Sequence, residues 1–155
     1  MPLCTATIIP TTLTACNLSC RLWPTWACKT ISLLCFPYTP GPRRFSTIRN
    51  SQFLHIVPPA SFLEINLLEQ NAKIVMTDSG GVQKEAFFFE RPCVILRPET
   101  EWVEIVDHGA GIIANADYNR IIAAYRQLVD HPVHFPHLFG NGHAAEKILE
   151  TILNN

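Results

Sequence analysis

Residues 74–86 carry the side chains whose types and order indicate chemistry most directly. An apolar run is followed by Thr-Asp-Ser, then by two glycines, and then by a helix-forming sequence. This order predicts a buried strand, a tight turn and a helix N-terminus. Unpaired N–H groups at a helix start favour negative charge, and glycines let a ligand approach the backbone. The segment therefore indicates a phosphate or diphosphate site at Ser79, Gly80 and Gly81, while a turn capped by Ser79 or Asp78 explains the local pattern equally well.

The surrounding sequence alternates short apolar runs with helix-forming segments. We expect helices at 61–71, with Ser61 as the cap, and at 82–89, 116–129 and 141–155, and strands at 55–57, 73–76, 93–96 and 111–114. The first of these helices has Phe62, Ile65, Leu67 and Leu68 on one broad apolar face. The alternation predicts an α/β fold in which helices flank a parallel sheet.

Ligands of such sheets bind beyond the carboxyl ends of the strands. Residues 77–81 follow one expected strand and residues 97–101 follow another. The two loops are therefore expected to meet over one pocket.

The first fifty residues differ in composition from the remainder of the chain. The whole chain has 155 residues, 48% of them apolar, and a net charge of −1. Residues 1–50 nevertheless contain no Asp or Glu, and they hold five of the six cysteines. They show neither helical nor strand periodicity. No basic start marks a signal peptide, the longest apolar run is too short to span a membrane, and the cysteines lack the paired spacing of a zinc site. A disulfide framework would require a secreted protein, which nothing in the sequence supports.

The remainder resembles the non-hydrolysing UDP-N-acetylglucosamine 2-epimerases over residues 54–155. Three segments at 77–86, 91–104 and 139–148 carry the resemblance, namely TDSGGVQKEA, RPCVILRPETEWVE and FGNGHAAEKI. Their order and spacing are those of the family. The resemblance implies part of the Rossmann-like C-terminal lobe of a two-lobed GT-B fold.

A frameshift explains the unusual first segment. Reading residues 36–42 one base out of frame permits Pro, Leu, His, Pro, Arg and Thr, and the same offset over residues 4–12 permits a His-Arg segment. The family has similar segments in this order. We therefore divide the chain into an aberrant, non-native or disordered segment, residues 1–50, and a UDP-binding part, residues 51–155.

The resemblance implies roles for several residues. Ser79, Gly80 and Gly81 would hold the diphosphate of a UDP-sugar, and Glu85 would accept hydrogen bonds from a ribose hydroxyl. Gln83 and Glu101 are weaker candidates that would orient the loops. Trp102 stands where some family members have Arg, so Arg97 is the alternative cation, although a structural ion pair explains Arg97 equally well.

The family reaction is the reversible epimerisation of UDP-N-acetylglucosamine at C2, in the cytoplasm, for envelope polysaccharides. Its acid–base carboxylates lie mainly in the other lobe, so we assign no catalytic residue here and expect the chain alone to be inactive. No nicotinamide fingerprint or metal site is visible, and we expect no cofactor, nucleic acid or membrane partner. A homodimer of the family type is an expectation for the full-length protein only. The alternatives are a glycosyltransferase lobe that binds a UDP-sugar and a non-catalytic gene relic.

Two further groups have simple structural explanations. His131, His134 and His137 are separated by prolines and are expected to be loop residues rather than metal ligands. Residues 87–89, three consecutive phenylalanines, are expected to pack a helix, because no basic patch accompanies them as a nucleic-acid site would require.

Overall fold

A computed structural model describes residues 6–9, 33–35, 56–57 and 60–154 of the chain, with side chains described over residues 60–154. All six strands of the sheet are parallel and have the order β3-β2-β1-β4-β5-β6. This is the strand order of the doubly wound Rossmann fold. The strands are β1 (Ala6–Ile9), β2 (Leu33–Cys35), β3 (Ile56–Val57), β4 (Ile74–Thr77), β5 (Cys93–Ile95) and β6 (Gly111–Ile113).

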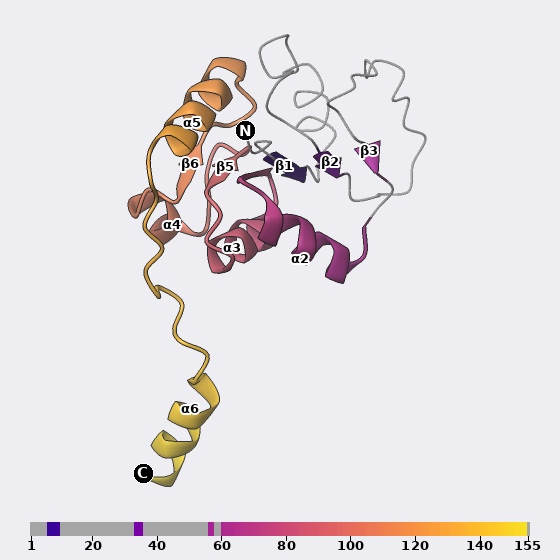
Figure 1. Cartoon of the computed structure of the whole chain (residues 1–155). Coiled ribbons are helices and arrows are strands. Elements are labelled where there is room, and N and C mark those ends of the chain that lie inside the picture. Colours follow the sequence, from indigo (N-terminus) through magenta and orange to yellow (C-terminus); the bar gives the residue numbers. More distant parts are fainter. Residues whose placement is uncertain (1–5, 10–32, 36–55, 58–59, 155) are drawn as a thin grey trace.

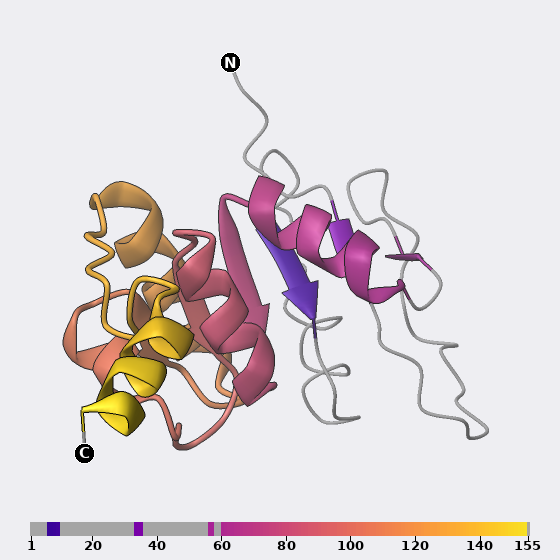
Figure 2. The same ribbon diagram turned by 90° about the horizontal axis from the view of Figure 1, so that it is seen from below.

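Helices cover both faces of the sheet, as the alternating sequence predicts. Figure 1 shows α2 and α3 on one side of the sheet and α5 on the other, and the rotated view in Figure 2 shows α2 and α3 side by side. The helices are α2 (Phe62–Asn71), α3 (Gly80–Phe88), α4 (Val103–Asp107), α5 (Tyr118–Asp130) and α6 (Ala144–Leu153). The α/β prediction is confirmed, and the arrangement is that of a Rossmann-like lobe of a GT-B fold.

Helix α2 begins where the sequence predicts. Ser61 is its N-cap and forms a capping box with Glu64, in which the Ser61 N–H donates to Glu64 Oε2 over 2.7 Å. Hydrogen bonds from Ser61 lower the pKa of the Glu64 carboxyl. Such reciprocal pairing satisfies two N–H groups that a helix start otherwise leaves unpaired.

The predicted apolar face of α2 is only partly covered, with Ile65 and Leu68 half-buried. The side chains of Phe62 and Leu67 are 69% and 58% exposed, whereas Glu69 is completely buried. Helix α2 instead packs through its C-terminal end, where Ala72 contacts Val75 of β4 and Ala86 of α3. Small side chains at this contact let the two helices approach closely. The broad apolar face inferred from the sequence therefore coincides only in part with the buried one.

The core follows the central strands. Every residue of β4 and β5 is buried, as expected for parallel strands covered on both faces. A second cluster joins α3, α4 and the segment after α5: Phe87, Ile105 and Ala110 pack against aromatic and aliphatic side chains that include Trp102 and Phe139. Through this cluster the segment after α5 packs against Trp102, at the beginning of α4.

Strands β1 and β2 lie in the first fifty residues, where the sequence shows no strand periodicity. Strand β1 pairs with β4, and Ile9 is in register with Thr77. Seven positions of this segment, four in β1 and three in β2, nevertheless lie in strands of the sheet. The remaining residues up to 55 lie outside the described ones, and the assignment of residues 1–50 as aberrant stays a prediction.

Helix α6 lies away from the sheet (Figure 1), and all its residues are exposed. It begins three residues later than predicted, at Ala144. In the described part of the chain, no helix is long and apolar enough to cross a membrane.

Candidate functional site

The glycine turn lies at the switch point of the sheet. Strands β1 and β4 are neighbours, and the chain leads outward from them in opposite directions, to β2 on one side and to β5 on the other. Thr77 ends β4, Ser79 caps α3, and the helix begins at Gly80, two residues earlier than predicted. Ligands of doubly wound sheets bind in the crevice at this point. The predicted site residues are therefore placed where the fold itself favours a ligand.

The Ser79 hydroxyl does not cap α3. The structure shows no cap hydrogen bond from the Ser79 side chain, while the Ser79 N–H donates to Thr77 Oγ1 over 3.0 Å. Ser79 therefore takes the N-cap position that the alternative explanation assigns to it, but its hydroxyl forms no capping hydrogen bond. Asp78 is buried and engaged in interactions of its own.

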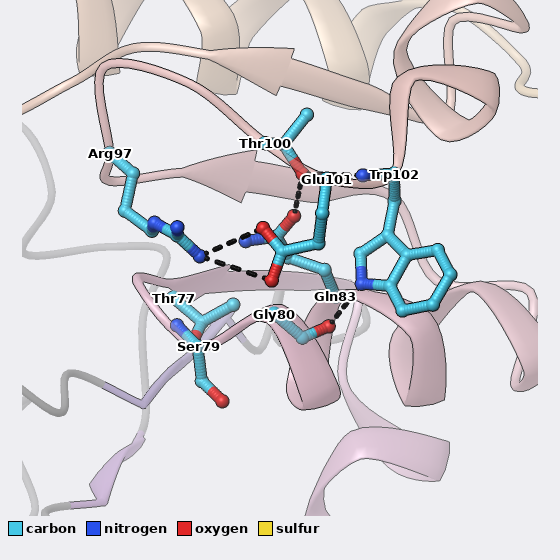
Figure 3. A network of polar contacts seen from close by, with 8 residues as sticks. All are labelled: Thr77, Ser79, Gly80, Gln83, Arg97, Thr100, Glu101 and Trp102. Atoms are coloured by element: carbon cyan, nitrogen blue, oxygen red, sulfur yellow. Dashed lines mark hydrogen bonds and ion pairs between the residues drawn. The ribbon is translucent and has the colours of Figure 1, made fainter.

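The two loops meet, as the sequence predicts. Figure 3 shows the loop after β5 lying over the start of α3. Thr100 Oγ1 donates to Gln83 Oε1 over 2.6 Å, and the Trp102 indole Nε1 donates to the Gly80 carbonyl over 2.8 Å. Both bonds join the β5–α4 loop to the first turns of α3. The loop is thereby fixed above the glycine turn.

A carboxylate occupies the space over Gly80. A Cβ at Gly80 would collide with the Glu101 carboxylate, whereas a Cβ at Gly81 would have only Ser79 Oγ nearby, at 3.8 Å. The absence of a side chain at Gly80 therefore accommodates Glu101, and Gly81 is the position that leaves room for a ligand.

Arg97 holds the Glu101 side chain. The Arg97 Nη1 atom lies 3.0 Å from Glu101 Oε2 and 3.4 Å from Oε1 (Figure 3). The side chains are 34% and 50% exposed, so this pair adds little to stability. It nonetheless brings a guanidinium group to the glycine turn. The structural ion pair considered for Arg97 is present.

Gln83 is completely buried beneath this loop. Its Oε1 accepts from Thr100, while its Nε2 has no hydrogen-bond partner. Buried amide groups are usually paired, and an unpaired donor costs free energy. Gln83 is therefore bonded to the loop through Thr100 and has an unpaired donor on the same side of α3 as Arg97 and Glu101 (Figure 3).

Glu85 lies on α3 four residues beyond Gly81 and is half-buried. Its negative charge acts on Glu69 of α2, a buried carboxyl whose oxygens have no hydrogen-bond partner. Burial, with the charge of Glu85 adding to it, raises the pKa of Glu69 to about 8. Burial likewise raises the pKa of the Cys93 thiol, with a smaller contribution from Glu69. Glu69 is therefore a buried carboxyl group that is largely neutral at pH 7.

Lys84 and Phe139 flank the Trp102 ring. The Lys84 Nζ atom lies 4.3 Å from the Trp102 ring centroid and 4.6 Å from that of Phe139. The two rings meet edge to face, with centroids 5.6 Å apart. The expectation of a packing role for the phenylalanine run holds for Phe87, which is buried, but Phe88 is 57% exposed.

The three histidines of the sequence analysis lie in the segment after α5 and are exposed. Two residues of this region had no sequence signal for their contacts: Glu69, which looks like an ordinary helix carboxylate, and Trp102, whose bond to Gly80 spans 22 residues. Among the described residues, no group of three or more His, Cys, Asp or Glu side chains is placed to hold a metal ion.

These features define a Rossmann-like lobe with a glycine turn at the switch point of its sheet. The sequence model of the UDP-N-acetylglucosamine 2-epimerases matches residues 29–153. The chain therefore belongs to the UDP-N-acetylglucosamine 2-epimerase family. The match begins before residue 54, where the resemblance in the sequence analysis starts.

Individual relatives agree with this assignment. The chain is 38% identical over 126 residues to a UDP-N-acetylglucosamine 2-epimerase homolog of Methanococcus maripaludis, with 77% of this chain and 35% of the relative covered. It is 41% identical over 100 residues to the UDP-2,3-diacetamido-2,3-dideoxy-D-glucuronate 2-epimerase of Pseudomonas aeruginosa, covering 64% of this chain and 28% of that protein. The chain thus spans about a third of the length of these curated relatives.

Solved structures show the same fold. The UDP-GlcNAc 2-epimerase of Methanocaldococcus jannaschii aligns with a TM-score of 0.80 at 23% identity, covering 100% of this chain and 47% of that one. The Neisseria meningitidis UDP-GlcNAc 2-epimerase, solved with UDP-GlcNAc bound, aligns with a TM-score of 0.74 at 24% identity, covering 100% and 45%.

Proposed function

We propose that this chain is the UDP-binding part of a UDP-sugar 2-epimerase. Ser79, Gly80 and Gly81 would hold the diphosphate, and the Glu85 carboxylate would accept a hydrogen bond from a ribose hydroxyl. The observation that supports this most strongly is the meeting of the glycine turn and the β5–α4 loop at the switch point of the sheet. The Neisseria meningitidis and Methanocaldococcus jannaschii structures, described with UDP-GlcNAc or UDP bound, give the same ligand class for this fold.

We propose further that the full-length protein interconverts UDP-N-acetylglucosamine and UDP-N-acetylmannosamine. This reaction eliminates UDP and returns it after protonation on the opposite face of the sugar, so it requires an acid, a base and a firm hold on the detached UDP. Of these three requirements, the residues of this chain fit only the hold on the detached UDP. The isolated chain should therefore bind UDP without catalysing epimerisation.

The sugar specificity is a separate matter. The Pseudomonas aeruginosa relative is named for a diacetamido glucuronate, and the Methanococcus maripaludis relative for a homolog of the N-acetylglucosamine enzyme. Both names describe inversion at C2 of a UDP-sugar. We therefore assign to this chain the recognition of UDP and leave the choice of sugar to the remainder of the protein.

Partners and location follow from the ligand in this proposal. The partner is a UDP-sugar rather than a nucleic acid or a membrane, and a homodimer is proposed for the full-length protein alone. A charged nucleotide sugar does not cross a membrane unaided, which supports a cytoplasmic location. Family membership favours the epimerase over a glycosyltransferase lobe. The other alternative, a non-catalytic gene relic, is tested by measuring whether the chain binds UDP.

Ligand-observed NMR with UDP tests the proposal. Gly81→Val should abolish the UDP signal because its side chain would enter the space beside the backbone, where only Ser79 Oγ lies within 4 Å of a Cβ. Val82→Ile, whose side chain packs against the Ala72–Val75–Ala86 cluster, is the matched control and should retain the signal. Gly80 is a poorer choice, because a side chain there would also displace Glu101. Equal signals from the wild type and Gly81→Val would exclude this turn as the diphosphate site.

A further inference from the structure

The indole of Trp102 contacts the glycine turn directly. Its Nε1 donates to the carbonyl oxygen of Gly80 over 2.8 Å (Figure 3). In an α-helix the carbonyl of the first residue also accepts from the N–H four residues later, and a carbonyl oxygen has two lone pairs for these two donors. The indole can therefore bond to Gly80 without breaking the helix. The hydrogen bond from Trp102, a residue outside α3, therefore restrains Gly80, the first residue of that helix.

The ring that makes this bond is itself restrained. Lys84 Nζ lies 4.3 Å from its centroid, and Phe139 meets it edge to face at 5.6 Å. Cation–π and edge-to-face contacts both stabilise such an arrangement. A tryptophan side chain also has only two rotatable angles to fix. The position of the indole therefore depends on Phe139, from the segment after α5, as well as on α3.

The backbone at Trp102 is restrained by a second route. Its N–H donates to Thr100 Oγ1 over 3.1 Å, and Thr100 Oγ1 donates to the buried Gln83. The loop is thus bonded to α3 at two positions one helical turn apart, Gly80 and Gln83. Two attachments fix both the position and the orientation of the loop relative to the glycine turn.

We infer that Trp102 is a positioning residue for the nucleotide site: its hydrogen bond to the Gly80 carbonyl holds the glycine turn in its binding geometry, with Phe139 and Lys84 holding the indole. This rests on the proposed function, because the turn that Trp102 fixes is the proposed diphosphate site. A turn that is already ordered loses less conformational freedom when a ligand binds. The segment after α5 thereby supports a site that it does not itself line.

Trp102→Phe is the variant that isolates the hydrogen bond, because a phenylalanine ring can still pack against Lys84 and Phe139 but has no N–H. Without this bond the glycine turn is less ordered before UDP binds, so UDP affinity should fall about three- to tenfold. Backbone NMR order parameters of the Gly80 and Gly81 amides should fall as well, on the picosecond to nanosecond timescale. Tyr118→Leu changes an exposed aromatic side chain of α5, on the other face of the sheet, and is the control, with affinity and order parameters as in the wild type.

The two readouts separate this inference from the function on which it rests. If the wild-type chain binds no UDP, the proposed function fails, while the glycine order parameters still decide the role of Trp102. Unchanged order parameters in folded Trp102→Phe would overturn the inference, whatever the affinity. Should Trp102→Phe fail to fold, Phe139→Leu keeps the N–H but releases the ring, and unchanged indole and glycine order parameters in that variant would overturn the inference equally.

Discussion

The carboxylate of Glu101 occupies the space that a side chain would take at Gly80. Gly80, the first residue of α3, is therefore matched in shape to the Glu101 side chain from the β5–α4 loop. Arg97 holds this carboxylate over Gly80, with its Nη1 atom 3.0 Å from Glu101 Oε2. The same contact brings one negative and one positive charge to the proposed diphosphate site. The affinity of the site for an anion should therefore depend on both charges, that of Glu101 and that of Arg97.

A methyl group at Gly80 should displace Glu101 without unfolding the protein. In Gly80→Ala, the flexible and half-exposed Glu101 side chain can turn away, losing an ion pair of small energetic value. The free energy of unfolding should stay within about 1 kcal/mol of the wild type, because alanine also favours the helix. Denaturant unfolding measures this. A decrease in the free energy of unfolding of about 3 kcal/mol or more would mean that the Glu101 side chain cannot move away from residue 80.

Arg97 should favour UDP binding by neutralising Glu101. Arg97→Gln leaves an unpaired carboxylate beside the diphosphate, so UDP affinity should fall about tenfold at low salt, an effect of about 1.4 kcal/mol. The double variant Arg97→Gln/Glu101→Gln should recover most of this loss. Titration calorimetry of both variants tests the expectation. A double variant as weak as the single one would show that Arg97 acts on the ligand directly rather than through Glu101.

The sequence predicted the elements whose signals are local. The Ser61 capping box marked the start of α2, and the continuous apolar run marked the buried β4. Helix α4 has five residues, too few to show a period, and it is not among the helices expected from the sequence. The apolar face of α2 was misjudged in part because tertiary packing buries Glu69 and leaves Phe62 exposed.

The place of the glycine turn in the fold could be predicted, but its contacts could not. The order strand, glycine turn, helix placed Ser79 to Gly81 correctly at the start of α3, since that signal is local. The bonds from Thr100 to Gln83 and from Trp102 to Gly80 join residues 17 and 22 positions apart. No periodicity specifies such pairs. They follow from the strand order, which brings the loop after β5 beside the end of β4.

Glu69 should make stability depend on pH. Its pKa is about 8 in the folded chain and near the ordinary 4.5 when unfolded. Between these values the folded chain holds the extra proton, so the free energy of unfolding should fall by about 1.4 kcal/mol per pH unit as pH rises. The stabilisation is fully present below pH 4.5 and is lost by the time pH has passed about 8. Urea unfolding at a series of pH values measures the slope.

Glu69→Gln cannot ionise, so its stability should lack this slope and exceed that of the wild type above pH 8. Glu104→Gln, at an exposed carboxylate of α4, is the control and should keep the wild-type slope. Identical slopes in the wild type and Glu69→Gln would show that Glu69 titrates normally.

The isolated chain should not epimerise UDP-N-acetylglucosamine. Without the acid–base groups of the other lobe, the rate should fall by several orders of magnitude. NMR of the sugar protons in deuterated buffer detects both epimerisation and exchange at C2. Turnover by purified chain that Glu85→Gln abolishes would contradict the expectation and place catalytic groups within these residues.

The central claim is that the start of α3 binds the diphosphate of UDP. The most direct measurement is a protein-observed NMR titration of the ¹⁵N-labelled chain with UDP and, in parallel, with uridine. UDP should shift the backbone amides of Gly80, Gly81 and Val82 in a saturable way, at about millimolar affinity because much of the full-length pocket is missing. Uridine, which has no phosphate, should leave these amides in place. Amides at the start of α3 that UDP does not move, or that uridine moves equally, would contradict the account.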